Sequence, residues 1–189
     1  LGVRLEAGLL TAHGGAVLTN DGFTAGLDAA LGDPVGVNAR ARLTQTATSL
    51  TVEVDGSLPG PIPLGPTLLG LFGLGGIVGL GARPALPTGG DPVQNQLNWN
   101  GQTEPDDGAV MLGATVSVGT LHDWGFTYSG WGKLILTLPD PSLRLALYVG
   151  ILQPRVTGSA APLKGVLVVD EDGITLGARG AITVPHLLD

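Results

Sequence analysis

Apolar and polar residues alternate with a period of two along much of this chain. The alternation is clearest over residues 23–31, 35–43, 50–54 and 174–178. In one of these segments Leu50, Val52 and Val54 are separated by Thr51 and Glu53. Successive side chains of a β-strand point to opposite faces, so this period predicts strands with one apolar and one polar face. We expect the apolar face to be buried and the polar face to meet water.

Two segments, 134–138 and 143–152, are apolar at nearly every position, with Arg144 as the main exception. Such runs are typical of strands that are covered on both faces, or that face a partner or lipid. We expect one face to meet the core of the domain. The other face would meet another chain, the rest of a longer chain, or lipid. The row of smaller side chains, which includes Ala146 and Tyr148, can admit a close neighbour and is the predicted contact side.

Short turn motifs separate the alternating segments. Asn20-Asp21-Gly22 and Asp172-Gly173 are predicted hairpin turns, because Asn, Asp and Gly tolerate positive φ. Further turn candidates are Asp55-Gly56, Asp107-Gly108 and Pro139-Asp140-Pro141-Ser142. Regular strands separated by such turns predict an antiparallel meander.

The region 57–82 breaks the alternation. It carries no charged residue, and half of the positions in 70–81 are glycine. We favour a buried, closely packed loop or pair of strands in which backbones touch. Contact with lipid and a transmembrane helix are the alternatives. The apolar residues of this run, Leu71, Phe72, Ile77 and Val78, are candidate contact residues.

No segment has a convincing helical pattern, and the best candidate, 66–78, contains too many glycines. Residues 84–107 are predicted to form a long surface excursion with a short strand around Leu97 and Trp99. The fold is therefore expected to be all-β, an antiparallel meander of about ten strands in an extended or strongly curved sheet or an open barrel. Residues 1–189 form a single β-rich domain in this interpretation. The start at Leu1 rather than Met indicates a fragment or a processed piece of a longer chain.

Composition excludes several classes of function. The formal net charge is -7, and the nine Lys and Arg residues are scattered singly, whereas a nucleic-acid site requires a basic cluster. The chain has no Cys, which removes disulfides and thiolate metal sites. The histidines His13, His122 and His186 are far apart, so we expect no metal site. We find no cofactor motif and no catalytic constellation, and expect no cofactor and no enzymatic activity.

One segment is similar to a known family. Leu71-Phe72-Gly73-Leu74-Gly75-Gly76-Ile77-Val78-Gly79-Leu80-Gly81 resembles the Gly/Leu/Phe-rich signature of an uncharacterised bacterial domain-of-unknown-function family of long, β-rich proteins. In that family the signature precedes a polar loop, strands like 111–113 and 146–150, and a hairpin like 168–174. The order agrees over residues 70–188, although Gly81-Ala82-Arg83 stands where the family often has an Asn-Arg pair. The resemblance implies a β-rich piece of a large bacterial protein and transfers no site residue.

The favoured functional hypothesis is a structural or interaction module of a large bacterial assembly or envelope-associated protein. Its partners would be other protein chains, copies of itself or the remainder of a longer chain, with lipid as a further partner. One alternative is a carrier of lipid or another hydrophobic ligand in an apolar β-groove. A second alternative is an outer-membrane β-barrel segment, against which an aromatic content of 4% counts, because such barrels carry aromatic girdles. A bacterial secreted or cell-envelope location fits these hypotheses better than a cytoplasmic one.

Overall fold

The computed structural model describes residues 2–7, 10–20, 22–31, 38–89, 91–99, 101–155 and 161–180. Within them the chain forms eleven strands and one short helix, α1 (Pro92–Leu97), between the sixth and seventh strands. The strands are β1 (Gly2–Ala7), β2 (Leu10–Thr19), β3 (Gly22–Leu31), β4 (Asn38–Thr46), β5 (Leu50–Pro63), β6 (Leu69–Pro84), β7 (Thr103–Thr120), β8 (Tyr128–Leu138), β9 (Ser142–Ile151), β10 (Leu163–Asp170) and β11 (Gly173–Gly180).

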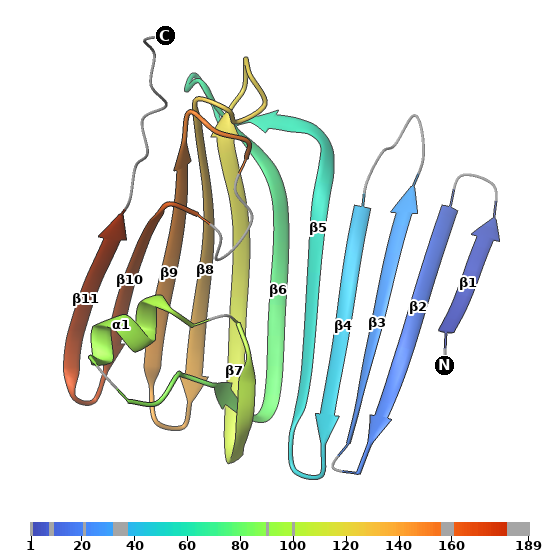
Figure 1. Ribbon diagram of the computed structural model, residues 1–189, viewed down its shortest axis with the longest axis vertical. Coiled ribbons are helices and arrows are strands. Elements are labelled where there is room, and N and C mark those ends of the chain that lie inside the picture. Colours follow the sequence, from blue (N-terminus) through green and yellow to red (C-terminus); the bar gives the residue numbers. More distant parts are fainter. Residues whose placement is uncertain are drawn as a thin grey trace, which may run out of the picture.

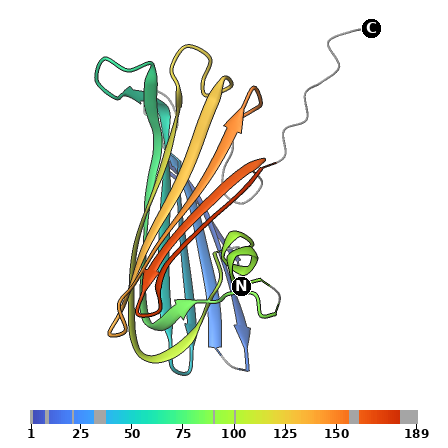
Figure 2. The same cartoon turned by 90° about the vertical axis from the view of Figure 1, so that its left-hand side faces the viewer.

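The strands form one antiparallel sheet in which each strand pairs with its neighbours in sequence (Figure 1). The predicted all-β antiparallel meander of about ten strands is confirmed. The order runs from β1 at one edge to β11 at the other, so the described sheet is open and not closed into a barrel. Figure 2 shows that the sheet is strongly twisted, because β9–β11 cross the direction of β2–β4 obliquely.

Connections at the two ends of the sheet differ in length. At the lower end in Figure 1, which we call the turn end, short turns at 47–49, 139–141 and 171–172 join consecutive strands. At the upper end, the loop end, the connections 64–68, 121–127 and 152–162 are longer. The predicted turns at 139–142 and at Asp172-Gly173 are therefore confirmed. Asn20 lies in the turn before Gly22, and Asp21 lies outside the described residues.

Two predicted turns are wrong, since Asp55-Gly56 lies inside β5 and Asp107-Gly108 lies inside β7. Gly56 pairs with Leu74 of β6 in an uninterrupted ladder, so the strand continues through it. Gly108 has a positive φ of 77° and falls where the pairing of β6 with β7 shifts register. The Asp-Gly pair in β7 therefore marks a bulge instead of a chain reversal.

The glycine-rich run forms most of β6, hydrogen-bonded to β5 on one side and β7 on the other. The expectation of strands with close backbone contact is confirmed, and a helix over these residues is excluded. The approach is close at Gly75, where a Cβ would lie 2.3 Å from both Asp55 Oδ1 and Thr115 Oγ1. Polar side chains of the two neighbouring strands thus occupy the space that a side chain at Gly75 would need.

Residues 85–102 leave the sheet at the turn end and fold back over one of its faces, where α1 packs against β10 and β11 (Figures 1 and 2). Asp91 caps α1 by accepting a 2.9 Å hydrogen bond from the N–H of Val93, and Pro92 occupies the first turn. The expected short strand around Leu97 and Trp99 is wrong, because Leu97 ends the helix. A six-residue helix is too short to show a helical pattern in the sequence. Among the described residues, no helix combines the length and apolar character needed to cross a membrane.

The two faces of the sheet differ in chemistry. On one face, which we call the apolar face, three adjacent rows of cross-strand partners from β2 to β11 contain no polar side chain. The first row is Ala12, Ala29, Ala39, Gly56, Leu74, Val116, Gly132, Leu147, Gly165 and Ala178; the second is Gly14, Leu27, Ala41, Val54, Gly76, Ala114, Leu134, Leu145, Leu167 and Leu176; the third is Ala16, Ala25, Leu43, Val52, Val78, Leu112, Leu136, Leu143, Val169 and Ile174.

The apolar face is the uncovered one, which corrects the expectation that alternating strands bury their apolar side. Leu27, Val54 and Leu134 are all exposed. Within the described residues the chain forms one sheet, and both the segment 85–102 and Ala161 pack on the opposite face. With no second layer among the described residues, the apolar rows stay uncovered there.

The predicted contact side of β9 is corrected for the same reason. Ala146 and Tyr148 are 3% and 5% exposed and pack with Ala161 and Trp131 of the same chain. The row of larger side chains is the uncovered one, and Leu147 is 45% exposed. As expected, one face of β9 meets the core and the other is open. The open face carries the larger side chains, however, and not the smaller ones.

Gly173 is expected to tolerate no β-branched side chain, although nothing crowds it. Its φ is 126°, and no atom lies within 4 Å of where a Cβ would be. Gly173→Val should lower the free energy of unfolding by about 1–2 kcal/mol through backbone strain alone, as measured by urea unfolding. Gly60→Val is the matched control, because Gly60 has open space and no positive φ. Equal stability of the two variants would contradict the assignment of Gly173 as a strained turn residue.

Candidate functional site

The face opposite the apolar face carries most of the charge of the strands. We call it the polar face and define it by three central rows of cross-strand partners. The first row is Arg4, His13, Asp28, Arg40, Asp55, Gly75, Thr115, Lys133, Ala146, Val166 and Gly177; the second is Gly2, Gly15, Gly26, Arg42, Glu53, Ile77, Gly113, Ile135, Arg144, Val168 and Thr175; the third is Glu6, Thr11, Ala30, Asn38, Ser57, Gly73, Ser117, Trp131, Tyr148, Lys164 and Arg179.

Charged side chains on the polar face bind one another across strands. The Arg40 guanidinium donates to Asp28 Oδ1 at 2.6 Å, which joins β4 to β3. The hydroxyl of Thr115 donates to Asp55 Oδ1 at 3.0 Å across the gap left by Gly75. These contacts require the polar residues of neighbouring strands to lie opposite one another, and the cross-strand register places them so.

Trp99 connects the covering segment to the polar face. Its ring packs with Ile77, Met111 and Ile135, and its indole N–H donates to the Gln102 carbonyl at 2.8 Å. The Lys133 ammonium lies 5.2 Å from the ring centroid, within the range of a cation–π contact. Trp99 is 2% exposed, so the sheet and the segment close around it completely.

Two buried cations lie beside Trp99 and differ in their partners. Lys133 Nζ binds Glu53 Oε1 at 2.7 Å. Arg144 lies 5.1 Å from the Trp99 ring centroid and is 4% exposed. In the described part of the chain, its Nη1 atom has no hydrogen-bond partner and its guanidinium has no carboxylate. A buried charge without a counter-ion opposes folding, because the loss of hydration is not offset.

Arg144→Met is therefore expected to stabilise the fold. Methionine keeps an apolar contact with Trp99 and removes the uncompensated charge, so the free energy of unfolding should rise by about 1–4 kcal/mol. Lys133→Met is the opposite control, because it leaves Glu53 without its cation and should destabilise the fold. Urea unfolding measures both variants. Destabilisation by Arg144→Met would show that the guanidinium gains more from its contacts than it loses in hydration.

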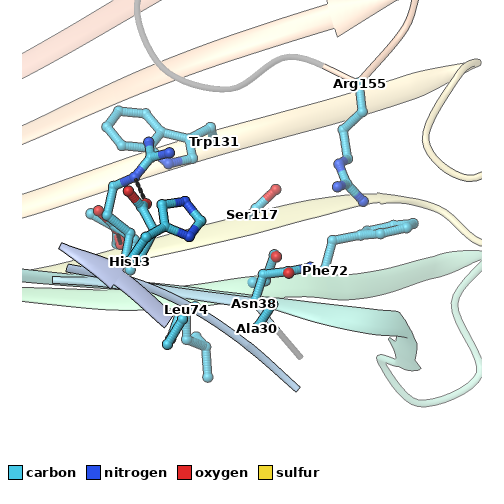
Figure 3. A pocket seen from close by; sticks show the side chains of 17 residues that line it. His13, Ala30, Asn38, Phe72, Leu74, Ser117, Trp131 and Arg155 are labelled. Carbon is cyan, nitrogen blue, oxygen red and sulfur yellow. Dashed lines mark hydrogen bonds and ion pairs between the residues drawn. The ribbon is translucent and has the colours of Figure 1, made fainter. Parts of the chain in front are cut away.

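The polar face is hollowed. A cavity of about 650 Å³ is lined by residues of β2 through β8, which requires this face to be concave. Figure 3 shows Trp131 and His13 near one end of the cavity and Arg155 and Phe72 near the other, with Ser117 between them. The Arg155 guanidinium lies 4.5 Å from the Phe72 ring centroid. The lining mixes apolar side chains, such as Phe72, Leu74 and Trp131, with hydroxyl, amide and charged groups, so the cavity is amphipathic.

The loop that joins β7 to β8 presents aromatic side chains at the loop end. The Asp123 carboxylate accepts hydrogen bonds from the backbone N–H of Thr127 at 2.7 Å and of Phe126 at 3.2 Å, and from the Thr120 hydroxyl. Partial burial works to raise the pKa of Asp123, but these hydrogen bonds hold it well below its usual value. The stabilisation that these hydrogen bonds give the loop is fully present above the pKa that Asp123 has in the unfolded chain. It is lost only as the pH falls through the lower pKa of Asp123 in the folded chain. Trp124 is 60% exposed on this loop.

The six candidate contact residues divide between the two faces. Val78 lies on the apolar face, and Leu71 pairs with Val118 at its upper margin. The other four, Phe72, Ile77, Ala146 and Tyr148, are buried on the polar side of the sheet. Most of the polar face was not identified from the sequence, because its charges are far apart in the chain and only strand pairing brings them into rows. The alternation of Thr51, Glu53 and Asp55 was the available signal.

Among the described residues, no group of three or more His, Asp or Glu side chains is placed to hold a metal ion. His186 lies outside the described residues. The geometry offers a polar, concave surface for binding or passage of solutes, backed by an apolar surface. No family model matches the chain, and comparisons with curated proteins and with solved structures gave no match.

Proposed function

We propose that the chain forms a section of a membrane-spanning β-sheet wall of the outer-membrane β-barrel type. The apolar face contacts lipid, and the concave polar face lines an aqueous space. The observation that carries this proposal is the set of three unbroken rows, ten residues each, without a polar side chain on one face and with charges on the other. Alternation of apolar-out and polar-in residues is what a membrane-spanning sheet requires.

The height of the apolar face supports contact with a bilayer. In β9 every outward position from Leu143 to Ile151 is apolar. β9 has 10 residues, and a tilted membrane-spanning β-strand needs about 9–11. The short turns 47–49, 139–141 and 171–172 also match this class, whereas the long segment 85–102 at the same end departs from it.

The placement of aromatic residues offsets their low number. Three of the eight aromatic residues, Trp124, Phe126 and Tyr128, gather at the loop end of β7 and β8. Trp124 and Phe126 are exposed there. Aromatic rings prefer the boundary between lipid and water, so this cluster is suited to the rim of the membrane.

The other two hypotheses fit the faces less well. A carrier needs an apolar groove, whereas the cavity of this sheet also places charged side chains, among them Asp28, Arg40 and Asp55, in its lining. A protein partner is expected to meet an apolar centre with a polar rim of standard size. The apolar face instead continues across ten strands with no polar island. An assembly module remains the outcome if lipid contact fails.

Quenching by brominated lipid tests the proposal. Leu43 and Arg42 are neighbours in β4 that face opposite sides of the sheet. Leu43→Trp and Arg42→Trp are each made in a chain with Trp124→Phe and Trp131→Phe, which leaves buried Trp99 as a constant background. In phosphatidylcholine vesicles with brominated acyl chains, Leu43→Trp should be strongly quenched and Arg42→Trp should not. Acrylamide in water should show the reverse order.

A water-exposed sheet gives a different pattern. Both variants would then be quenched by acrylamide, and neither by brominated lipid. That result would contradict a lipid-facing role and favour the assembly module. Quenching of both variants by brominated lipid would contradict the assignment of the polar face to an aqueous space.

A further inference from the structure

The cations of this acidic chain are concentrated on the polar face. Its three central rows hold seven cationic side chains, namely Arg4, Arg40, Arg42, Lys133, Arg144, Lys164 and Arg179. The same rows hold four carboxylates, namely Glu6, Asp28, Glu53 and Asp55. Seven positive minus four negative charges leave these rows at +3, whereas the whole chain has a formal net charge of -7.

Local pairing leaves part of this positive charge uncompensated. Glu6 binds Arg4, Asp28 binds Arg40, and Glu53 binds Lys133. Among the described residues, no ion pair involves Arg42, Lys164 or Arg179. The fourth carboxylate, Asp55, accepts a hydrogen bond from Thr115. Surplus cations raise the local concentration of anions over these rows. Arg42, Lys164 and Arg179 lie outside the lining of the 650 Å³ cavity.

The acidic residues lie mostly elsewhere. A second hollow, of about 550 Å³ at the turn end, is lined by Glu104, Asp106, Asp107, Asp140, Asp170, Glu171 and Asp172. Its two cations are Arg83, which pairs with Glu104 and Asp106, and buried Arg144. The turn end is therefore acidic, whereas the three central rows of the polar face, which share Arg144 with this hollow, have the opposite sign.

We propose that the polar face is an anion-attracting surface, so that small inorganic and organic anions are the solutes it concentrates and guides. This inference rests on the proposed function, since it names the solute class of the aqueous space that the polar face would line. Rings of Arg and Lys give anion preference to pores, while carboxylate rings give cation preference. The acidic turn end opposes anions, so they enter from the loop end.

Collisional quenching of Trp131 by iodide and caesium measures the sign of the field. Trp131 lies in the third row of the polar face, and in a Trp124→Phe chain the only other indole is buried Trp99. The full chain is studied in dodecylphosphocholine micelles at low salt, and a Trp131→Phe chain reports on Trp124. We expect an iodide-to-caesium quenching ratio about threefold higher at Trp131, since a potential of about half kT separates anion from cation by that factor.

Two substitutions with the same change in total charge localise the effect. Lys164 is two strands from Trp131, or about 10 Å, and Lys164→Glu should lower the ratio roughly twofold. Arg83→Glu lies about ten residues along β6 from the row of Trp131, roughly 33 Å away, and should leave the ratio unchanged.

A ratio at Trp131 equal to or below that at Trp124 would overturn the inference, as would an equal response to Lys164→Glu and Arg83→Glu. These outcomes are independent of the brominated-lipid test. Lipid contact with no iodide preference would keep the membrane wall and reject the anion assignment. Iodide preference without lipid contact would keep an anion-attracting surface on a protein outside the membrane.

Discussion

Leu134→Arg is expected to prevent stable insertion of the chain into a bilayer without harming its solubility in water. Leu134 lies in the middle row of the apolar face, between Ala114 of β7 and Leu145 of β9, and is exposed. A lipid-facing Arg near the bilayer midplane costs about 2–4 kcal/mol. This energy lowers membrane partitioning roughly 30- to 900-fold. Flotation of phosphatidylcholine vesicles with bound protein measures the change.

Leu68→Arg is the matched control. Leu68 is even more exposed than Leu134, but it lies in the loop-end connection 64–68, outside the apolar rows. The same substitution should therefore leave flotation close to that of the parent chain. If both variants float like the parent, the apolar face does not contact lipid. If both fail to float, the effect follows from added charge and not from its position.

Trp99→Ala is expected to detach the covering segment 85–102 and to lower the free energy of unfolding by about 3–5 kcal/mol. Removal of a fully buried indole leaves a cavity among Ile77, Met111 and Ile135. It also removes the ring beside the Lys133 ammonium. Urea unfolding in micelles measures the stability, and faster proteolysis within 85–102 measures the detachment.

Trp124→Ala provides the comparison for that loss. Trp124 is the same residue type on an exposed loop, and surface substitutions of this kind change stability by about 0.5 kcal/mol or less. Equal losses for the two variants would contradict the role of Trp99 as the contact that fixes the covering segment. Normal stability with rapid proteolysis would place the segment outside the cooperative unit.

The period of the sequence predicted the strands well, because alternation is a local property. Leu50, Val52 and Val54 occupy one face of β5, and Thr51 and Glu53 the other, as the pattern indicated. The same pattern did not predict which face is covered. A strand that buries its apolar side in a core and one that turns it toward lipid have the same period. The difference lies in which other parts of the chain pack on each face, and among the described residues the segment 85–102 packs on the polar side.

Asp-Gly pairs predicted a turn correctly only where the hydrogen-bonded pairing of two strands ended. Asp172-Gly173 forms a turn because β10 and β11 pair on both sides of it. Asp55-Gly56 has the same residue types but continues into β5, since Gly56 finds a partner on β6 and another on β4. An Asp-Gly pair permits the chain to reverse direction. Whether the reversal occurs depends on how the flanking residues pair with other strands.

The sequence by itself determined the all-β class, the meander and the segregation of apolar and polar residues to opposite faces. Each follows from neighbours a few residues apart. Tertiary structure alone decided that Trp99 closes over Lys133 and Arg144, and that singly scattered cations fall into rows on one concave face. The physical reason is cross-strand register. It places residues such as Arg42 and Arg144 in one row through long-range hydrogen bonding, which no local pattern contains.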